Sequence, residues 1–299
     1  MSMFIVRNDY IRANIWDNFI ENSINSVEFL KKWYLDVVVP KWIAIILNDF
    51  LMAMPIPYKS FIAAKLIDTP PFLPYMGIIS RIGFQQEDFT NFISKLPGNY
   101  MFIDYRFNKF NNLPFLTKLF FYSVNLSYSY QYLYNNYSDK IKKYLSNNEY
   151  KIYVGIIPSL IRNFLIRNNL LTSRQLQIIM RLISESLLKE KGIIYGAYDK
   201  GDRLVGFAFF LLSKYSTDLI YIATEGNRED IAVYIIDKFL KKNEMSSITL
   251  NFTCSFCRKF LHIFRNMATD KYYVYSYYSR YLKKVWEYKR KNSSDGFIL

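Results

Sequence analysis

The sequence has 299 residues, of which 51% are hydrophobic and 21% are charged, and its formal net charge at pH 7 is +14. This globular composition excludes a chain that is disordered over most of its length, and the length suffices for two domains of ordinary size. Cys254 and Cys257 are the only cysteines and His262 is the only histidine, which excludes a four-ligand zinc site.

The excess of basic residues suggests a nucleic acid, an anionic lipid surface or an acidic substrate as partner. The chain is also rich in Ile, Lys, Asn, Tyr and Phe, which AT-rich codons favour. Such a codon bias would supply lysine without a functional cause. The net charge alone therefore does not separate a functional origin from a compositional one.

No uninterrupted apolar stretch reaches the roughly 18 to 20 residues that a membrane-spanning helix needs. Asn48–Asp49 interrupts the apolar run that begins at Trp42. Lys118 and Asn125 interrupt the run that begins at Phe115. The N-terminus lacks the apolar core of a secretion signal. We therefore expect a soluble cytoplasmic protein with no integral membrane segment.

The first part of the chain predicts two helices followed by a sheet. Apolar residues recur on one side of 11–23, and Ser26 can cap a second helix that stops before Pro40. Asn48–Asp49 is a two-residue turn signal between two apolar runs, which indicates a hairpin. The expected strands are 42–47, 50–54, 75–80 and 100–105, and a further helix is expected over 86–93.

The second part of the chain repeats this order after two linking helices. The first linking helix is expected over 128–148, and Thr172 caps the second, which runs to Lys191. Lys200-Gly201-Asp202 then separates two short apolar runs and predicts a hairpin. The next elements are strands over 218–224 and 247–252, made parallel by the helix over 228–243 between them, then a helix over 256–267 and a closing strand over 272–282.

The order hairpin, strand, helix, strand thus occurs in both halves, which predicts one α/β (α+β) fold used twice. Each half is expected to hold a mixed, mostly antiparallel sheet with one parallel crossover and flanking helices. The expected boundaries are a first domain over 1–130, linking helices over 131–191, the core of a second domain over 192–285 and a tail over 286–299.

Five short motifs are distributed over nearly the whole chain. They are Trp33-Tyr34-Leu35-Asp36, Met54-Pro55-Ile56-Pro57, Pro70-Pro71-Phe72 with Gly77, Tyr137-Ser138 with Lys142-Lys143, and the run from Arg203 to Phe210. These motifs are similar to those of an uncharacterised GNAT-like family common in Bacteroidetes. The element order resembles the GNAT acyltransferase fold, and its tandem use resembles the Fem-type aminoacyltransferases that add amino acids to peptidoglycan precursors.

The resemblance implies a transferase that moves an acyl or aminoacyl group onto an amine in a cleft between the two halves. Acyl-CoA or aminoacyl-tRNA is the implied co-substrate, which makes tRNA a candidate partner. The implied acceptor is an amine on a small molecule or on a lipid or peptidoglycan precursor. The alternative is a protein that kept the fold for binding, RNA being one candidate ligand, and lost the chemistry.

The sequence departs from the GNAT pattern at two places that bear on this choice. A CoA-binding GNAT enzyme usually has a glycine-rich turn after the fourth strand, whereas residues 225–230 contain one glycine and three carboxylates, which would repel a diphosphate. The fifth strand usually ends with an acidic residue and a Gly-Ser pair, whereas residues 251–255 read Asn-Phe-Thr-Cys-Ser. Both departures favour a different donor or an inactive domain.

The candidate donor-binding residues lie where a strand feeds a helix, because the free amides of a helix start can hold anionic or acyl groups. Thr224 and Gly226 are candidate hydrogen-bond donors, and Asn227 and Arg228 are candidates for an anionic group. The alternative for Arg228 is a solvated residue of the first turn.

Further candidates come from other parts of the chain. Lys142 and Lys143 are expected to contact phosphate, or else to form an exposed helix face. Trp33, Tyr34 and Phe72 are expected to line the bottom of the acceptor site, or else to pack beside a sheet. The candidates for catalysis are Tyr275 and Ser255, with a cross-strand pair as the alternative for Tyr275. No metal site is expected.

Overall fold

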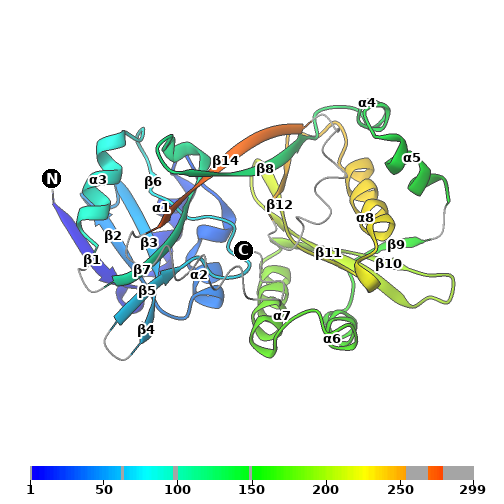
Figure 1. The fold of residues 1–299 in the computed structure, drawn as a ribbon, viewed down its shortest axis with the longest axis horizontal. Coiled ribbons are helices and arrows are strands. Elements are labelled where there is room, and N and C mark those ends of the chain that lie inside the picture. The colour runs from blue at the N-terminus through cyan, green and yellow to red at the C-terminus, as the bar shows by residue number, and fades with distance from the viewer. Residues whose placement is uncertain (1, 62–63, 97–99, 148–149, 254–268, 279–299) are drawn as a thin grey trace. The chain divides into compact units, whose positions relative to one another are not determined.

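The computed structural model describes residues 2–61, 64–96, 100–147, 150–253 and 269–278. These residues form two compact units (Figure 1). The first takes in the chain up to Phe120 and the segment that starts at Tyr273, and the second takes in Phe121–Tyr272. Helices and mixed sheets occur in both, so the fold is of the α/β class that the sequence predicts.

The first unit contains two sheets. One is antiparallel throughout, in the order β1 (Met3–Arg7), β2 (Trp42–Leu47), β3 (Met52–Pro57) and β6 (Ile79–Ser80). The other follows the order β4 (Lys59–Phe61), β5 (Ala64–Asp68), β7 (Tyr100–Phe107) and β14 (Thr269–Tyr278). Its β5 and β7 are parallel, because α3 (Gln86–Ser94) forms the crossover between them.

Aromatic side chains fill the core of the first unit beside α1 (Ala13–Glu21) and α2 (Lys32–Val38). On α1, Trp16, Phe19 and Ile20 recur at helical spacing and are fully buried. The Trp16 ring meets Trp42 edge-on at 5.0 Å, and its indole N–H donates to the Leu30 carbonyl at 2.8 Å. Burial of each such ring contributes about 2 to 3 kcal/mol, which fixes α1 on the antiparallel sheet.

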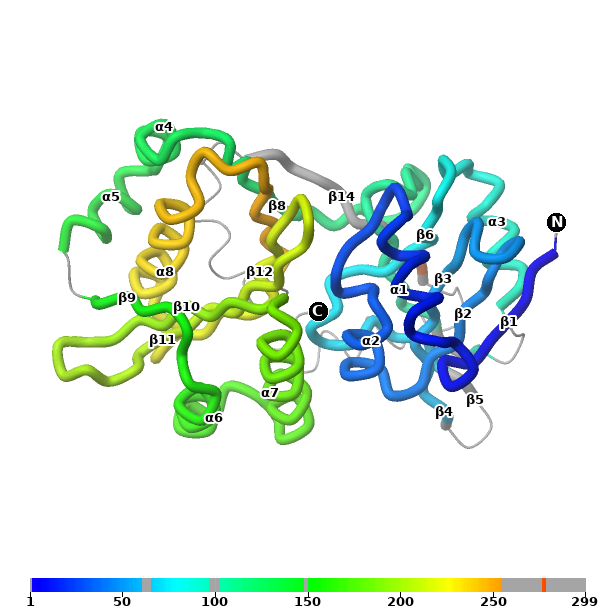
Figure 2. The backbone as a smooth tube through the Cα atoms, turned by 180° about the vertical axis from the view of Figure 1, so that it is seen from behind, coloured from blue at the N-terminus to red at the C-terminus, as the bar shows by residue number. Residues whose placement is uncertain are grey.

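The second unit is one mixed sheet with helices on both faces. Its strands are β8 (Thr117–Asn125), β13 (Thr249–Phe252), β12 (Ser216–Thr224), β11 (Leu204–Leu212), β10 (Gly192–Tyr198) and β9 (Lys151–Val154), in that spatial order. Among the described strand pairs of this unit, β12 and β13 alone are parallel, and the helix α8 (Glu229–Lys242) forms the crossover between them. Figures 1 and 2 show α8 on one face, and α6 (Pro158–Arg167) and α7 (Ser173–Leu188) on the other.

Side chains from β11 pack in both directions. Phe210 stacks on Phe239 of α8 with ring centroids 4.2 Å apart, whereas Phe207 meets Phe164 of α6 edge-on at 5.8 Å. Strand alternation sends these two phenylalanines to opposite faces. The sheet is therefore buried on both sides, which explains the continuous apolar run that predicts this strand.

Most of the strand expected over 75–80 is an irregular segment, whose backbone is held by hydrogen bonds to the buried side chain of Asn111. Gly77 has φ of +95°, and the amide of Asn111 bonds both the N–H and the carbonyl of Ile78, at 2.9 and 2.8 Å. Within this segment, Ile79 and Ser80 pair with β3 as a short strand, and Met76 forms an isolated parallel bridge with Phe107 of β7. Among the described strands, the one that pairs in parallel with β7 is β5.

Three other expected elements differ in detail. The helix over 128–148 is divided into α4 (Tyr130–Asn135) and α5 (Asp139–Ser146), because the Ser138 hydroxyl accepts a bond from the Ile141 N–H and begins a new helix. The helix expected from Ser26 begins as the 3-10 turn Glu28–Leu30 before α2. The segment 131–191 contributes β9 in addition to helices.

Other expectations are met. The capping box of Thr172 and Gln175 begins α7, and α8 carries acidic residues in its first turn and lysines in its last. The helix expected over 256–267 lies outside the described residues. None of the described helices combines the length and apolar character needed to cross a bilayer.

Candidate functional site

The loop between β12 and α8 is built as a tight left-handed turn. Gly226 and Asn227 have φ of 64° and 55°, and they carry the chain from the end of β12 into the first turn of α8. Thr224 is buried, and its hydroxyl donates to the carbonyl of Arg228 at 2.9 Å. Among the described residues, no side chain caps α8, and no atom lies within 4 Å of the place where a Cβ on Gly226 would be. The backbone at Gly226 is thus accessible.

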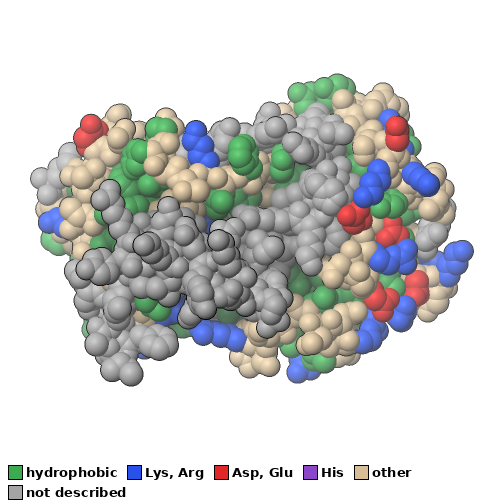
Figure 3. Space-filling model, in the orientation of Figure 1, with side chains coloured by type: hydrophobic (Ala, Val, Ile, Leu, Met, Phe, Trp, Pro, Cys, Tyr) green, Lys and Arg blue, Asp and Glu red, His purple; other side chains and the backbone are tan. Residues whose placement is uncertain are grey.

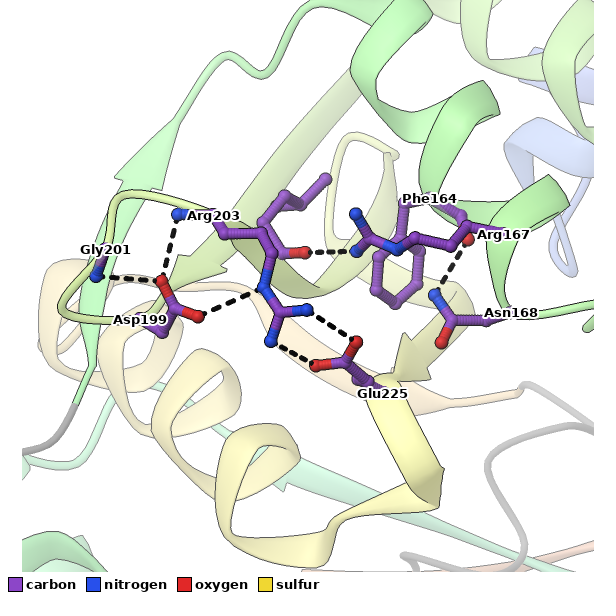
Figure 4. A network of polar contacts seen from close by, with 8 residues as sticks. Phe164, Arg167, Asn168, Asp199, Gly201, Arg203 and Glu225 are labelled. Atoms are coloured by element: carbon purple, nitrogen blue, oxygen red, sulfur yellow. Dashed lines mark hydrogen bonds and ion pairs between the residues drawn. The ribbon is translucent and has the colours of Figure 1, made fainter.

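The acidic residue before this turn is paired with a basic residue of the β10–β11 hairpin. Arg203 donates from both terminal nitrogens to the Glu225 carboxylate, at 3.2 and 2.9 Å. It also donates to Asp199, whose carboxylate accepts the N–H groups of Gly201 and Arg203 (Figure 4). The Arg203 backbone bond is the main cause that lowers the pKa of Asp199. Glu225 therefore presents no uncompensated charge at the loop.

The two carboxylates in the first turn of α8 are paired as well. Lys140 of α5 lies 2.5 Å from Glu229, and Arg228 lies 2.5 Å from Asp230. Asp230 also accepts the hydroxyl of Tyr150 at 3.0 Å, and the Arg228 guanidinium lies 5.6 Å from the Tyr150 ring centroid. The helix start that could hold an anion is thus surrounded by internal ion pairs.

A second candidate site lies on β7 in the first unit, around a buried carboxylate. Side chains alternate along β7, so Tyr105 and Phe107 point to one face while Asp104 and Arg106 point to the other. Asp104 is 1% exposed and Arg106 is 5% exposed. Neither carboxylate oxygen of Asp104 has a hydrogen-bond partner among the described residues. An unpartnered buried carboxylate is costly, and such groups concentrate at functional sites.

Polar side chains of the neighbouring strands share this face of β7. Asp68 of β5 is directly opposite Asp104, and Ser276 of β14 is opposite Arg106. The Ser276 hydroxyl is also buried without a partner among the described residues, whereas Asp68 pairs with Lys59 at 2.6 Å. We call Asp68, Asp104, Arg106 and Ser276 the Asp104 cluster.

The environment of the Asp104 cluster brings the pKa of the Asp104 carboxyl close to neutral pH. The pKa of Asp104 is raised from 3.8 to about 6, mainly because the carboxyl is buried; the Arg106 charge lowers this pKa and the smaller effect of the Asp68 charge raises it. The carboxylate is therefore ionised at pH 7 and accepts a proton readily. A pKa of this kind suits a general base.

The comparisons with known proteins are structural, because no family model and no curated protein matches the sequence. FemX superimposes with a TM-score of 0.58 and 8% identity over 96% of this chain and 99% of that one. L-PGS from Bacillus licheniformis gives 0.54 and 9%, over 93% and 95%. A tandem GNAT protein from the clavulanic acid biosynthesis pathway gives 0.53 and 8%, over 93% and 98%. This chain has a tandem GNAT-like fold of the Fem type.

Within this GNAT-like fold, the lysine that reaches the start of α8 is Lys140. Lys142 instead donates to the carbonyl of Asn135 at 3.3 Å and lies over the ring of Tyr134. Lys143 is exposed in the last turn of α5. Sequence spacing alone could not separate the three lysines, because the acidic partner Glu229 is far away in the chain.

The aromatic residues predicted for the acceptor site do come together in the first unit. The Tyr34 hydroxyl donates to the Phe72 carbonyl, and the Trp33 ring meets Tyr34 edge-on at 5.4 Å. Tyr34 and Phe72 are buried, so packing is the role that this structure gives them. Their part in acceptor binding stays a prediction.

The two catalytic candidates from the sequence, Tyr275 and Ser255, stay predictions. Tyr275 pairs with Phe107 in the register of β14 and β7, and Ser255, like Cys254, Cys257 and His262, lies outside the described residues. No group of three or more metal-binding side chains occurs in the described part of the chain.

The sequence did contain a signal for Asp104. The strand predicted over 100–105 contains Asp104, and the oppositely charged Arg106 follows two positions later. Charged residues are rarely buried unless they are paired or functional. Their burial could not be inferred from the sequence, because the face opposite a strand's core side is often solvated.

Proposed function

We propose that the protein is a transferase that moves an acyl or aminoacyl group onto an amine, with Asp104 as the general base. The observation that carries the proposal is the buried, unpartnered carboxylate of Asp104 with its pKa near 6. The tandem GNAT-like fold supports the reaction class, because the fold is shared with FemX and with a tandem GNAT protein.

The proposed step forms a bond between the acceptor nitrogen and the donor carbonyl carbon. The bond from that carbon to the leaving group breaks, and the leaving group is a CoA thiolate or the ribose oxygen of a tRNA. The nitrogen loses a proton, which Asp104 accepts, and protonated Asp104 is neutral in its buried position. A base with a pKa of about 6 takes up this proton and releases it again near neutral pH.

The loop between β12 and α8, in the second unit, is a separate proposed contact for the donor and does not bear on the role proposed for Asp104 in the first unit. The backbone of Gly226 is accessible, and the amides of Gly226, Asn227 and Arg228 are candidates for holding a carbonyl or an anionic group. The ion pairs around Glu225, Glu229 and Asp230 favour a donor that is not anchored there by a diphosphate.

The experiment supplies purified protein with charged tRNAs or acyl-CoAs and a panel of amine acceptors, and N-acylated product is measured by mass spectrometry. Asp104→Asn should lower the rate about 10²- to 10⁴-fold, as expected for loss of a general base. Asp49→Asn makes the same chemical change in an exposed turn of the first unit and should leave the rate unchanged. The proposal fails if no donor supports transfer, or if Asp104→Asn transfers at the wild-type rate.

A further inference from the structure

A pocket of about 350 Å³ lies in the second unit beside α8. Its aromatic walls are Tyr130 and Tyr134 of α4, Tyr150, which precedes β9, and Tyr234 of α8. Its charged groups all come from α8, and they are Asp237, Lys238 and Lys241. The volume is at the small end of the range for ligand sites, about 300 to 1,000 Å³.

Hydrogen bonds hold the wall tyrosines in place. The hydroxyl of Tyr150 donates to Asp230 at 3.0 Å, and the hydroxyl of Tyr234 donates to the carbonyl of Leu145 at 3.3 Å. The rings of Tyr150 and Tyr234 meet edge-on at 5.2 Å. Because the rings are fixed before any ligand arrives, little side-chain freedom would be lost on binding.

Two tyrosines donate hydrogen bonds to one of the two carboxylate oxygens of Asp237. Its Oδ1 accepts the hydroxyls of Tyr130 and Tyr137, at 2.8 and 3.0 Å. No hydrogen bond to Oδ2 occurs among the described residues, and this carboxylate lines the pocket. Burial is the main cause that raises the pKa of Asp237, so a cation bound here would relieve a desolvated charge.

Aromatic rings beside a carboxylate favour an organic cation, because the ring face is electrostatically negative. A ring of this pocket already attracts a cation of the chain, since the Lys241 ammonium lies 5.3 Å from the Tyr130 ring centroid. Lys238 and Lys241 line the same pocket, so a ligand that is only cationic would meet two like charges. A polyanion would instead meet Asp237. The charges together favour a ligand that carries both signs.

We propose that this pocket binds a small zwitterion, with its ammonium group against Asp237 and the tyrosine rings and its carboxylate or phosphate against Lys238 and Lys241. The shared chemistry includes free betaines and amino acids, and phosphocholine or phosphoethanolamine as free compounds or lipid headgroups. All the residues that carry this inference belong to the second unit, and it does not depend on the proposed transfer reaction.

Isothermal titration of the full chain with phosphocholine and with glycine betaine tests this site, with choline and inorganic phosphate as the two separate halves. At least one zwitterion should bind about tenfold more tightly than either half, because each half makes only one of the two charge contacts. Vesicles of phosphatidylcholine distinguish a lipid headgroup from a free compound. Absence of saturation by both zwitterions up to about 10 mM, ten times a millimolar dissociation constant, would overturn the proposal.

Variants then locate the binding. Asp237→Asn and Tyr134→Leu should each weaken zwitterion binding about three- to tenfold, whereas Tyr134→Phe keeps the ring and should bind as the wild type does. The double change of Lys238→Ala with Lys241→Ala should remove the advantage of the zwitterion over choline. Lys242→Ala is the matched control on α8, outside the pocket. Equal affinity in Tyr134→Leu and the wild type would refute this location, even if Asp237→Asn does not fold.

Discussion

Replacing Asp104 by Asn should stabilise the protein at neutral pH while removing its proposed activity. In the folded chain, burial raises the pKa of Asp104 from 3.8 to about 6, which corresponds to about 3 kcal/mol. Between these two values the folded state holds the proton that the unfolded state has already lost. The free energy of unfolding therefore falls as the pH rises through this window, and it stays lower above pH 6.

Asn cannot ionise, so Asp104→Asn should escape this loss. The stability difference between the variant and the wild type should therefore be about 2.5 kcal/mol more favourable to the variant at pH 8 than at pH 4. This gain would show that the ionised Asp104 lowers the stability of the wild type, which is common for residues that serve an active site.

Urea unfolding followed by tryptophan fluorescence measures this difference in the relevant unit. The described tryptophans, Trp16, Trp33 and Trp42, all belong to the first unit, and Trp16 and Trp42 are buried. Asp49→Asn makes the same chemical change in an exposed turn of this unit and serves as the control. A difference between Asp104→Asn and the wild type that is the same at pH 4 and pH 8 would refute the reasoning.

Two further substitutions test the packing of each unit. Gly77→Ala should lower the free energy of unfolding by about 3 kcal/mol, because the new Cβ would lie 2.2 Å from Asn111 Oδ1 and disrupt two buried hydrogen bonds at a positive φ. Gly83→Ala, whose new Cβ would have no described atom within 4 Å, should change the free energy of unfolding by less than about 0.5 kcal/mol in the same urea titration, and equal effects of the two substitutions would contradict this account. Arg203→Ala should shift the midpoint of thermal unfolding by no more than about 2 °C, because its ion pairs are exposed, and the shift should shrink in high salt. A large shift of the midpoint that does not depend on salt, measured by calorimetry, would show that Arg203 stabilises the protein by more than exposed ion pairs.

Local signals predicted the second unit well. The turn at Lys200-Gly201-Asp202 connects β10 to β11, and the helix expected over 228–243 matches α8. The parallel pairing of β12 with β13 also follows from the crossover rule. These features are determined within short stretches of chain, so the sequence alone was sufficient.

Features that depend on distant residues were not predicted. The segment around Gly77 is fixed by Asn111, and Lys140 rather than Lys142 finds Glu229 across the second unit. Asp104 becomes notable only once both faces of β7 are buried. A single sequence gives residue types and their spacing, but it does not give which distant side chains come into contact after folding.

On the face seen in Figure 3, acidic side chains lie beside basic ones over the second unit. At the start of α8 this mixing has an evolutionary consequence. Glu225, Glu229 and Asp230 each pair with a different basic residue, so exchanging any one of them for a neutral residue leaves that basic residue with one carboxylate fewer. A lineage could acquire a glycine-rich diphosphate cradle here only through several coupled changes. The loop is thus resistant to drift toward CoA-type recognition by single steps.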